Sequence, residues 1–139
     1  MAQKVTILFI ICTFILGCKK DKDQGDIPFI PVNLSLDIDN PAYRDVKIPG
    51  GFIYLDGGSK GIILYRKNND DFVAYDRHSP VDATKGCACA VSEDALFIED
   101  ECSNAVWLIT DGTPQNDNTT RFLLEYGTSF NGRTIRVFN

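Results

Sequence analysis

DRHSPVDATKGCACAVSEDALFIEDECSNAVWLITDG, residues 76–112, is the stretch that decides the fold. Two polar turns flank two short segments, residues 87–91 and 95–99, and this pattern predicts a β-hairpin held between two turns. The stretch contains His78, the only histidine of the chain, and every cysteine after residue 18. We therefore expect the side chains best suited to metal or disulfide chemistry to lie at these turns.

Short apolar or alternating segments surround this stretch, and the intervening Gly, Pro, Asn and Asp residues are typical of turns. No segment keeps a period of 3.6, so the sequence predicts an all-β sandwich or barrel with one core. Residues 43–48 are expected to be extended, and residues 127–132 to connect the last two strands. The remaining predicted strands cover residues 32–38, 52–55, 61–66, 72–76, 105–110, 122–126 and 134–138.

The first residues have the pattern of an export signal. Lys4 precedes an apolar run at residues 5–16, which is too short to span a bilayer as a helix. The run ends in Ile-Leu-Gly-Cys, which resembles a bacterial lipobox and implies removal of residues 1–17 and lipidation of Cys18. An uncleaved signal anchor is the alternative. Residues 18–31 then form a charged tether, and the formal charge of −5 argues against a nucleic-acid partner.

Several short motifs occur in a characteristic order. Gly57-Gly58, residues 61–66 and residues 72–77 are followed by Pro80, and the second half contains WLITDG, LLEY and a closing IRVFN. In this order and spacing, residues 32–139 resemble the Rieske-like lipoproteins of Bacteroidetes. The resemblance implies antiparallel sheets, a small subdomain inserted at about residues 76–112, and a place in the bacterial outer membrane, on its periplasmic face or at the cell surface.

The resemblance also implies a [2Fe–2S] cluster held by Cys-x-His in one turn and Cys-x-x-His in the other. In this sequence the four ligand positions fall on Ser79, Val81, Asp100 and Ser103, none of which is a ligand of that type. We therefore expect no cofactor. The alternative is an atypical [2Fe–2S] cluster that uses Cys102, His78 and a carboxylate or serine.

The cysteines of an exported protein are expected to form a disulfide. In a hairpin centred near residues 93 and 94, Cys87 faces Asp100, and Cys102 lies two residues further along the same face. A Cys87–Cys102 bridge is therefore favoured, with Cys89–Cys102 as second choice. A zinc site formed by His78, Cys87, Cys89 and Cys102 is the alternative. His78 itself is interpreted either as a ligand or base, or as a turn residue bonded to backbone.

These observations favour a membrane-anchored envelope lipoprotein that is not an enzyme. Its domain would serve as a structural or interaction module, with an envelope protein as the expected kind of partner. Electron transfer through an atypical cluster is the second hypothesis. Binding of zinc or a small ligand at the vacated turns is the third.

Overall fold

The computed structural model describes residues 24–139. The predicted signal segment, the lipidation site Cys18 and the first part of the tether lie outside the described residues. Within this range the chain forms nine strands and two short 3₁₀ helices. In chain order the elements are β1 Asn33–Asp37, η1 Pro41–Val46, β2 Phe52–Leu55, β3 Ile62–Arg66, β4 Phe72–Asp76, η2 Ala83–Lys85, β5 Ala90–Val91, β6 Phe97–Asp100, β7 Ala105–Leu108, β8 Glu125–Phe130 and β9 Thr134–Phe138.

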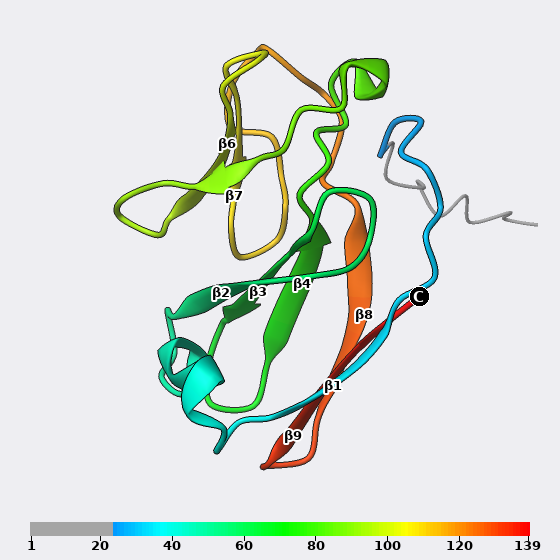
Figure 1. Ribbon diagram of the computed structural model, residues 1–139. Coiled ribbons are helices and arrows are strands. Elements are labelled where there is room, and N and C mark those ends of the chain that lie inside the picture. The colour runs from blue at the N-terminus through cyan, green and yellow to red at the C-terminus, as the bar shows by residue number, and fades with distance from the viewer. Residues whose placement is uncertain (1–23) are drawn as a thin grey trace, which may run out of the picture.

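The strands form two antiparallel sheets (Figure 1). The large sheet has the order β1-β9-β8-β4-β3-β2, and the small sheet has the order β5-β6-β7. All three strands of the small sheet come between β4 and β8 in sequence, so the small sheet is an insertion in the large one. The predicted all-β class, with a small inserted subdomain, is confirmed.

The large sheet has a core on each of its faces. Ile62 and Leu64 of β3 face one cluster, whereas Ile63 and Tyr65 face a second cluster that includes Trp107 of the small sheet. All five residues of β3 are consequently buried, and so are all five of β4. This double burial explains why β3 is a continuous apolar run in the sequence rather than an alternating one. It also fixes the small sheet against the end of the large one.

One segment that was expected to be extended is helical. Pro41 to Val46 form η1, because Asn40 caps the first turn through its side chain, which accepts a hydrogen bond from the amide of Ala42 at 3.0 Å. Proline at the first helical position is also favourable. The guanidinium of Arg66 then holds the end of η1 by donating to the carbonyl oxygens of Val46 and Lys47.

The eighth strand begins and ends later than predicted. Residues 122–124 form a loop instead, and β8 continues through Gly127 to Phe130. Gly127 suits this position because Phe138 lies opposite it on β9 and covers it with its ring. A Cβ at residue 127 would come within 2.7 Å of that ring. The glycine therefore accommodates an aromatic ring inside a strand, and the prediction that it begins a turn was wrong.

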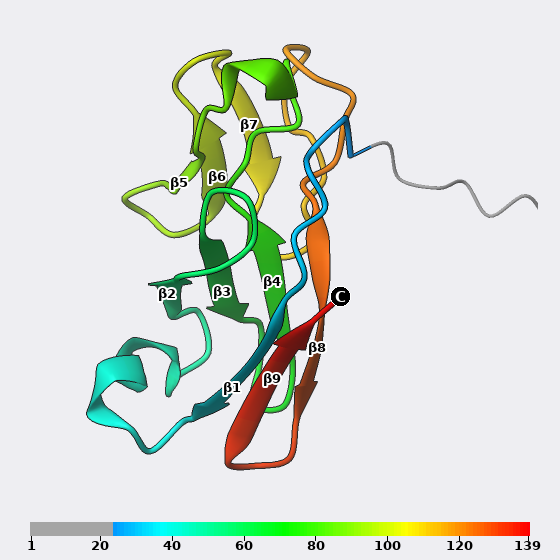
Figure 2. The same ribbon diagram turned by 45° about the vertical axis from the view of Figure 1, so that its right-hand side comes forward.

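The entry segment, residues 24–32, runs along the large sheet before β1 (Figure 2). At its start, the side-chain amide of Gln24 donates to the carbonyl oxygen of Leu123 at 3.3 Å. At its end, the amide of Val32 donates to the side chain of Asn139 at 2.9 Å. The segment is therefore attached to the domain at both of its own ends. No helix within residues 24–139 is long and apolar enough to cross a membrane.

Candidate functional site

The first turn, residues 76–81, is organised by a buried carboxylate. Asp76 is fully buried at the end of β4. One of its oxygens accepts from the amide of His78 at 2.7 Å, and the other accepts from the amide of Ser59 at 2.6 Å and the phenol of Tyr126 at 2.7 Å. A carboxylate with this many donors is well satisfied without a counter-ion. Asp76 thus fixes the backbone that carries Ser79 and Val81.

The second turn, which follows β6, is organised by Asp100, whose side chain is also buried. Its Oδ1 accepts from the amide of Cys102 at 3.0 Å. Its Oδ2 accepts from two hydroxyls, Ser79 at 2.7 Å and Ser103 at 2.6 Å. The bond from Ser79 crosses between the turns, so three of the four positions named from the family resemblance meet in one hydrogen-bonded group. Val81, the fourth, is partly buried against the second core cluster.

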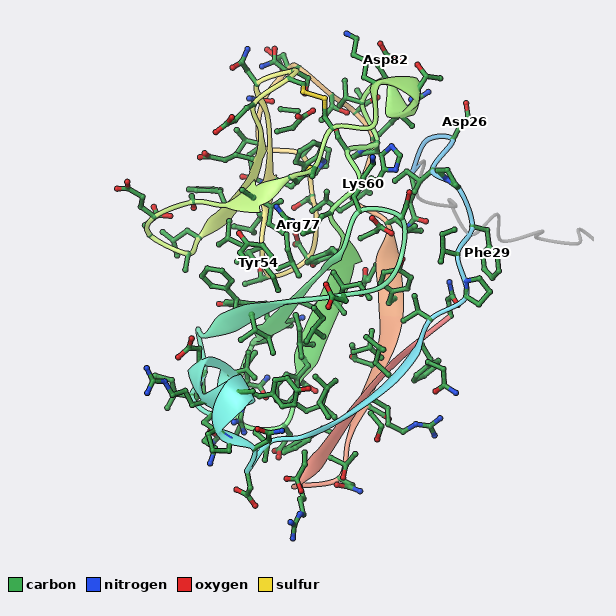
Figure 3. All side chains as sticks on the ribbon, in the orientation of Figure 1. Asp26, Phe29, Tyr54, Lys60, Arg77 and Asp82 are labelled. Atoms are coloured by element: carbon green, nitrogen blue, oxygen red, sulfur yellow. A yellow bond between two sulfur atoms is a disulfide. The ribbon has the colours of Figure 1, made fainter. Side chains whose placement is uncertain are left out.

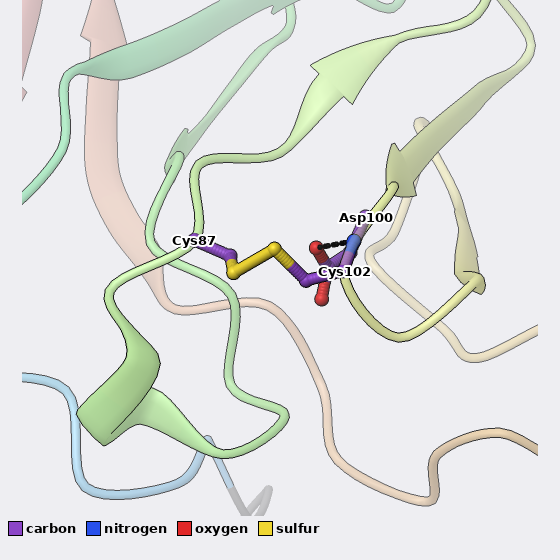
Figure 4. Close-up of side chains that lie close together, drawn as sticks. All are labelled: Cys87, Asp100 and Cys102. Carbon is purple, nitrogen blue, oxygen red and sulfur yellow. Dashed lines mark hydrogen bonds between the residues drawn. A yellow bond between two sulfur atoms is a disulfide. The ribbon is translucent and has the colours of Figure 1, made fainter.

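A disulfide beside this hydrogen-bonded group joins the segment between η2 and β5 to the second turn. Cys87 and Cys102 are bonded, with their Cα atoms 6.4 Å apart, and they are 15 positions apart in sequence. This is the bridge that the sequence favoured, and it rules out the second choice, Cys89–Cys102, in the same molecule. The two sulfurs and a carboxylate oxygen of Asp100 lie within 4.8 Å of one another (Figure 4).

The hairpin register differs from the prediction by two residues. Ala90 pairs with Glu99 and Val91 with Ile98, so partners add up to 189 rather than 187. Continued towards the turns, this register places Cys87 opposite Cys102. The predicted pairing of Cys87 with Asp100 was therefore wrong, although the bridge inferred from it was right.

Cys89 is the remaining thiol of the described residues and is fully buried. Burial raises the pKa of this thiol to about 12, and the negative charge of Asp100 acts in the same direction. At neutral pH Cys89 is therefore a protonated, apolar-like side chain and not a nucleophile.

His78 is buried, and both of its ring nitrogens have partners. Nε2 lies 2.7 Å from the carbonyl oxygen of Ala83, which can only accept, so this nitrogen carries a proton. Nδ1 lies 2.7 Å from the hydroxyl of Ser59, which donates to it when the ring is neutral. The ring therefore links the first turn to η2 and to the β2–β3 loop. Within residues 24–139 the grouped potential metal ligands are Cys87, Asp100 and Cys102, and His78 and Cys89 are not part of this group.

The side chains at the turns do not fit a [2Fe–2S] cluster with two thiolates and two imidazoles. Ser79, Asp100 and Ser103 bond to one another, and Val81 offers no ligand atom. Cys102, which an atypical cluster would need, is bonded to Cys87.

Comparison with solved structures finds chains with a similar arrangement, among them two named proteins. One is the ferredoxin of carbazole 1,9a-dioxygenase from Nocardioides aromaticivorans IC177, at 16% identity and a TM-score of 0.48, covering 79% of this chain and 98% of that one. The other is NirD of E. coli, at 13% identity and a TM-score of 0.45, covering 76% and 98%. No protein-family model and no curated protein sequence matches the chain.

Two features of the site were not anticipated from the sequence. One is the role of Asp100 as the acceptor that joins both turns. The other is the network of Asp76 with Tyr126, a residue 50 positions away. The sequence signal for the second was Gly58, where a Cβ would overlap both Asp76 and Tyr126. A glycine at positive φ beside a buried acid indicates a close approach of this kind.

Proposed function

We propose that this chain is an anchored envelope lipoprotein whose Rieske-like domain holds no iron–sulfur cluster and acts as a structural or interaction module. In this proposal Cys18 is lipidated, residues 18–31 connect the lipid to the domain, and the protein resides in the outer membrane on its periplasmic face or at the cell surface. The domain does not catalyse a reaction. Its contribution is a rigid two-sheet body presented at the membrane.

One observation carries the cluster-free part of this proposal. At the positions where the resemblance implies iron ligands, two hydroxyls and a carboxylate satisfy one another. Beside them, the Cys87–Cys102 disulfide joins the second turn to the segment before β5, where the carbonyl oxygen of Cys87 accepts a hydrogen bond from the amide of Ser79 in the first turn. Hydrogen bonds and a disulfide thus supply the cross-links that a metal cluster would otherwise provide between the turns. The two turns therefore need no metal to keep their arrangement.

An iron inventory tests this part. The full chain, with Cys12→Ser and Cys18→Ser to remove the leader thiols, is produced with ample iron and then treated with iron and sulfide without oxygen. We expect no bound iron and no visible absorption. About two irons per chain with the paired visible bands of a [2Fe–2S] centre would instead favour electron transfer.

A matched variant tests whether the scaffold itself has been kept. It restores the four ligand types through Ser79→Cys, Val81→His, Asp100→Cys and Ser103→His. We expect this variant to take up iron and become coloured while the parent does not. A folded variant that remains colourless would count against a Rieske-like geometry at the turns.

Lipidation is tested separately in a bacterial host with radiolabelled palmitate. We expect the wild-type chain to be labelled and to fractionate with membranes, and Cys18→Ser to lose both properties. The matched control is Cys12→Ser, which should behave as the wild type. Labelling that persists in Cys18→Ser would contradict the proposed anchor.

A further inference from the structure

The carboxylate of Asp100 is buried without a cation. Among residues 24–139, no lysine or arginine forms an ion pair with it, and its three partners are one amide and two hydroxyls. A buried charge is costly to leave uncompensated. Its two nearest potential co-ligands are the sulfurs of Cys87 and Cys102, within 4.8 Å (Figure 4). This part of the second turn therefore combines the negative charge of Asp100 with two soft donor atoms, the sulfurs. The sulfurs cannot act as thiolate ligands only because they are bonded to each other.

The two oxygens of Asp100 differ in what they have left to offer. Oδ2 already accepts two hydroxyls, which fix the plane of the carboxylate. Oδ1 accepts only the amide of Cys102 and keeps room for a second partner. Polar groups that orient a ligand carboxylate in this way are typical of the surroundings of protein-bound metals.

The bridge is open to a reductant, whereas the third thiol is not. Cys102 is exposed and Cys87 is partly buried, so a small dithiol can reach their sulfurs. A cleft of about 240 Å3 lies along the same turn, and acidic side chains line part of it. The lining residues are Glu99, Asp100, Glu101, Asn104, Ala105 and Val106. Cys89 is fully buried and takes no part.

We propose that reduction of the Cys87–Cys102 disulfide creates a binding site for a zinc-like divalent cation, with the two cysteines and Asp100 as ligands. A dithiol reductant supplies two electrons and two protons, is itself oxidised to a disulfide, and leaves two thiols. Binding of the cation then releases the two thiol protons to solvent. A small-molecule disulfide can reverse this: it accepts two electrons from the thiolates and two protons from solvent, becomes two thiols, and leaves the Cys87–Cys102 bond re-formed and the cation released. Metal occupancy therefore reports the thiol–disulfide balance of the surroundings.

The chemistry of the donors selects the cation. Thiolates favour zinc and similar borderline-soft ions over calcium and magnesium, which prefer oxygen ligands alone. Two sulfurs and one carboxylate oxygen, with water in a fourth position, complete a tetrahedron. This ligand set differs from the zinc site given as the alternative from sequence, because both nitrogens of His78 are already bonded and Cys89 lies outside the group.

Cobalt(II) titration tests the site, since thiolate ligation to cobalt gives a strong near-ultraviolet band. The protein is the full chain with Cys12→Ser and Cys18→Ser, either oxidised or reduced by a dithiol that is then removed without oxygen. We expect the reduced protein to bind one cobalt per chain with this band, zinc to displace it, and the oxidised protein to show none. Absence of the band after complete reduction would overturn the proposal.

Three variants assign the ligands. Cys102→Ser is expected to lose the band, and Cys89→Ser, the matched control, to keep it with unchanged affinity. Asp100→Asn, checked for folding by circular dichroism, is expected to bind at least tenfold more weakly. A band that survives in Cys102→Ser, vanishes in Cys89→Ser, or is unaffected in folded Asp100→Asn would refute the assignment. This inference goes beyond the proposed function, and its readout is separate from iron content, so each fails on its own measurement.

Discussion

At the scale of single residues, two buried aspartates hold the two turns. Asp76 gathers amides from the β2–β3 loop and its own turn, and Asp100 gathers hydroxyls from both turns. Neither is paired with a cation within the described residues. Their energetic importance therefore lies in the donors they satisfy, because an amide or hydroxyl left buried without an acceptor is destabilising.

The Asp76 network provides a graded test. Asp76→Ala leaves three backbone amides and a phenol without their acceptor, so we expect the free energy of unfolding to fall by at least about 3 kcal/mol. Tyr126→Phe removes a single donor and should lower it by about 2 kcal/mol. Urea unfolding followed by Trp107 fluorescence measures both. Equal losses in the two variants would show that the amides do not depend on Asp76.

Cys89 gives a pH-dependent prediction. The pKa of this thiol is about 12 in the folded protein and about 8.5 in an unfolded chain, so folding favours the protonated form. Its contribution to stability is fully present below about pH 8.5 and is lost as the pH rises towards 12. We expect wild type to lose more stability than Cys89→Ala between pH 8 and pH 10.

The comparison with Cys89→Ala is needed because burial also raises the pKa of Tyr75 and Tyr126, which then contribute in the same direction. Both variants share these tyrosines, so the difference between them belongs to the thiol. The same thiol should react with a thiol reagent only after unfolding. Parallel stability curves for wild type and Cys89→Ala would contradict the assignment of a raised pKa.

The sequence identified the residues that meet at the two turns, but it did not predict the hydrogen bonds between them. The family resemblance named Ser79, Asp100 and Ser103, which come from separate turns, and the structure joins them. What the sequence could not supply was the direction of the bonds, since serine and aspartate in a turn usually bond to nearby backbone. The choice between local and cross-turn partners depends on how closely the two turns approach.

At the scale of elements, the small sheet is tied to its neighbours by one covalent bond. The disulfide closes a loop of about 15 residues that contains β5 and β6. Closing such a loop lowers the conformational entropy of the unfolded chain and so raises the free energy of unfolding by about 3 kcal/mol. The hairpin alone has a two-residue strand, β5, on its outer edge and depends on this restriction.

Removal of the bridge tests this dependence. We expect the double variant Cys87→Ser, Cys102→Ser to be less stable than wild type by about 3 kcal/mol in urea. Wild type under a reducing agent should show the same loss, which serves as the control for any effect of the serines. Hydrogen exchange should increase most in β5 and β6. A uniform increase over both sheets would indicate that the domain unfolds only as a whole.

The strands themselves were largely predictable, whereas the hairpin register was not. β2, β4 and β9 have the predicted bounds because alternation and turn residues mark both of their ends. The register changed because the turn after β5 extends to Leu96, with Ala95 at φ +56°. The amide of Ile109 fixes this longer turn by donating to the carbonyl oxygen of Leu96 at 3.0 Å. Because this contact joins residues on either side of β6 and β7, the sequence of the turn itself gives no sign of it.

At the scale of the whole molecule, the disulfide end and the η1 end lie at opposite extremes of the domain (Figure 3). The entry segment begins towards the disulfide end of the domain (Figures 1 and 2). Gly25 is close to the carbonyl oxygen of Pro80, which also accepts a hydrogen bond from Arg121. A chain that enters at this end carries the domain with its disulfide turned towards the point of attachment.

The proposed lipid anchor turns this geometry into a prediction. Gln24 lies six positions after Cys18, and a fully extended chain covers only about 21 Å over six positions. In lipid vesicles, a fluorophore at Lys85→Cys on η2 should therefore be quenched by headgroup-labelled lipid. A fluorophore at Asn131→Cys, in the turn between β8 and β9, should not. Stronger quenching at Asn131→Cys would reverse the proposed orientation.

With the proposed anchor, the position of the entry segment would also give the two ends of the domain different surroundings, the membrane at one end and the aqueous phase at the other. A cleft of about 530 Å3 lies between η1 and β2, towards the end of the domain away from the attachment. With Cys18 anchored as proposed, soluble molecules approaching from the aqueous phase would meet this cleft first. The Cys87–Cys102 sulfurs would then face the headgroup layer, and electron donors that travel within the lipid would have a shorter path to them than donors dissolved in water.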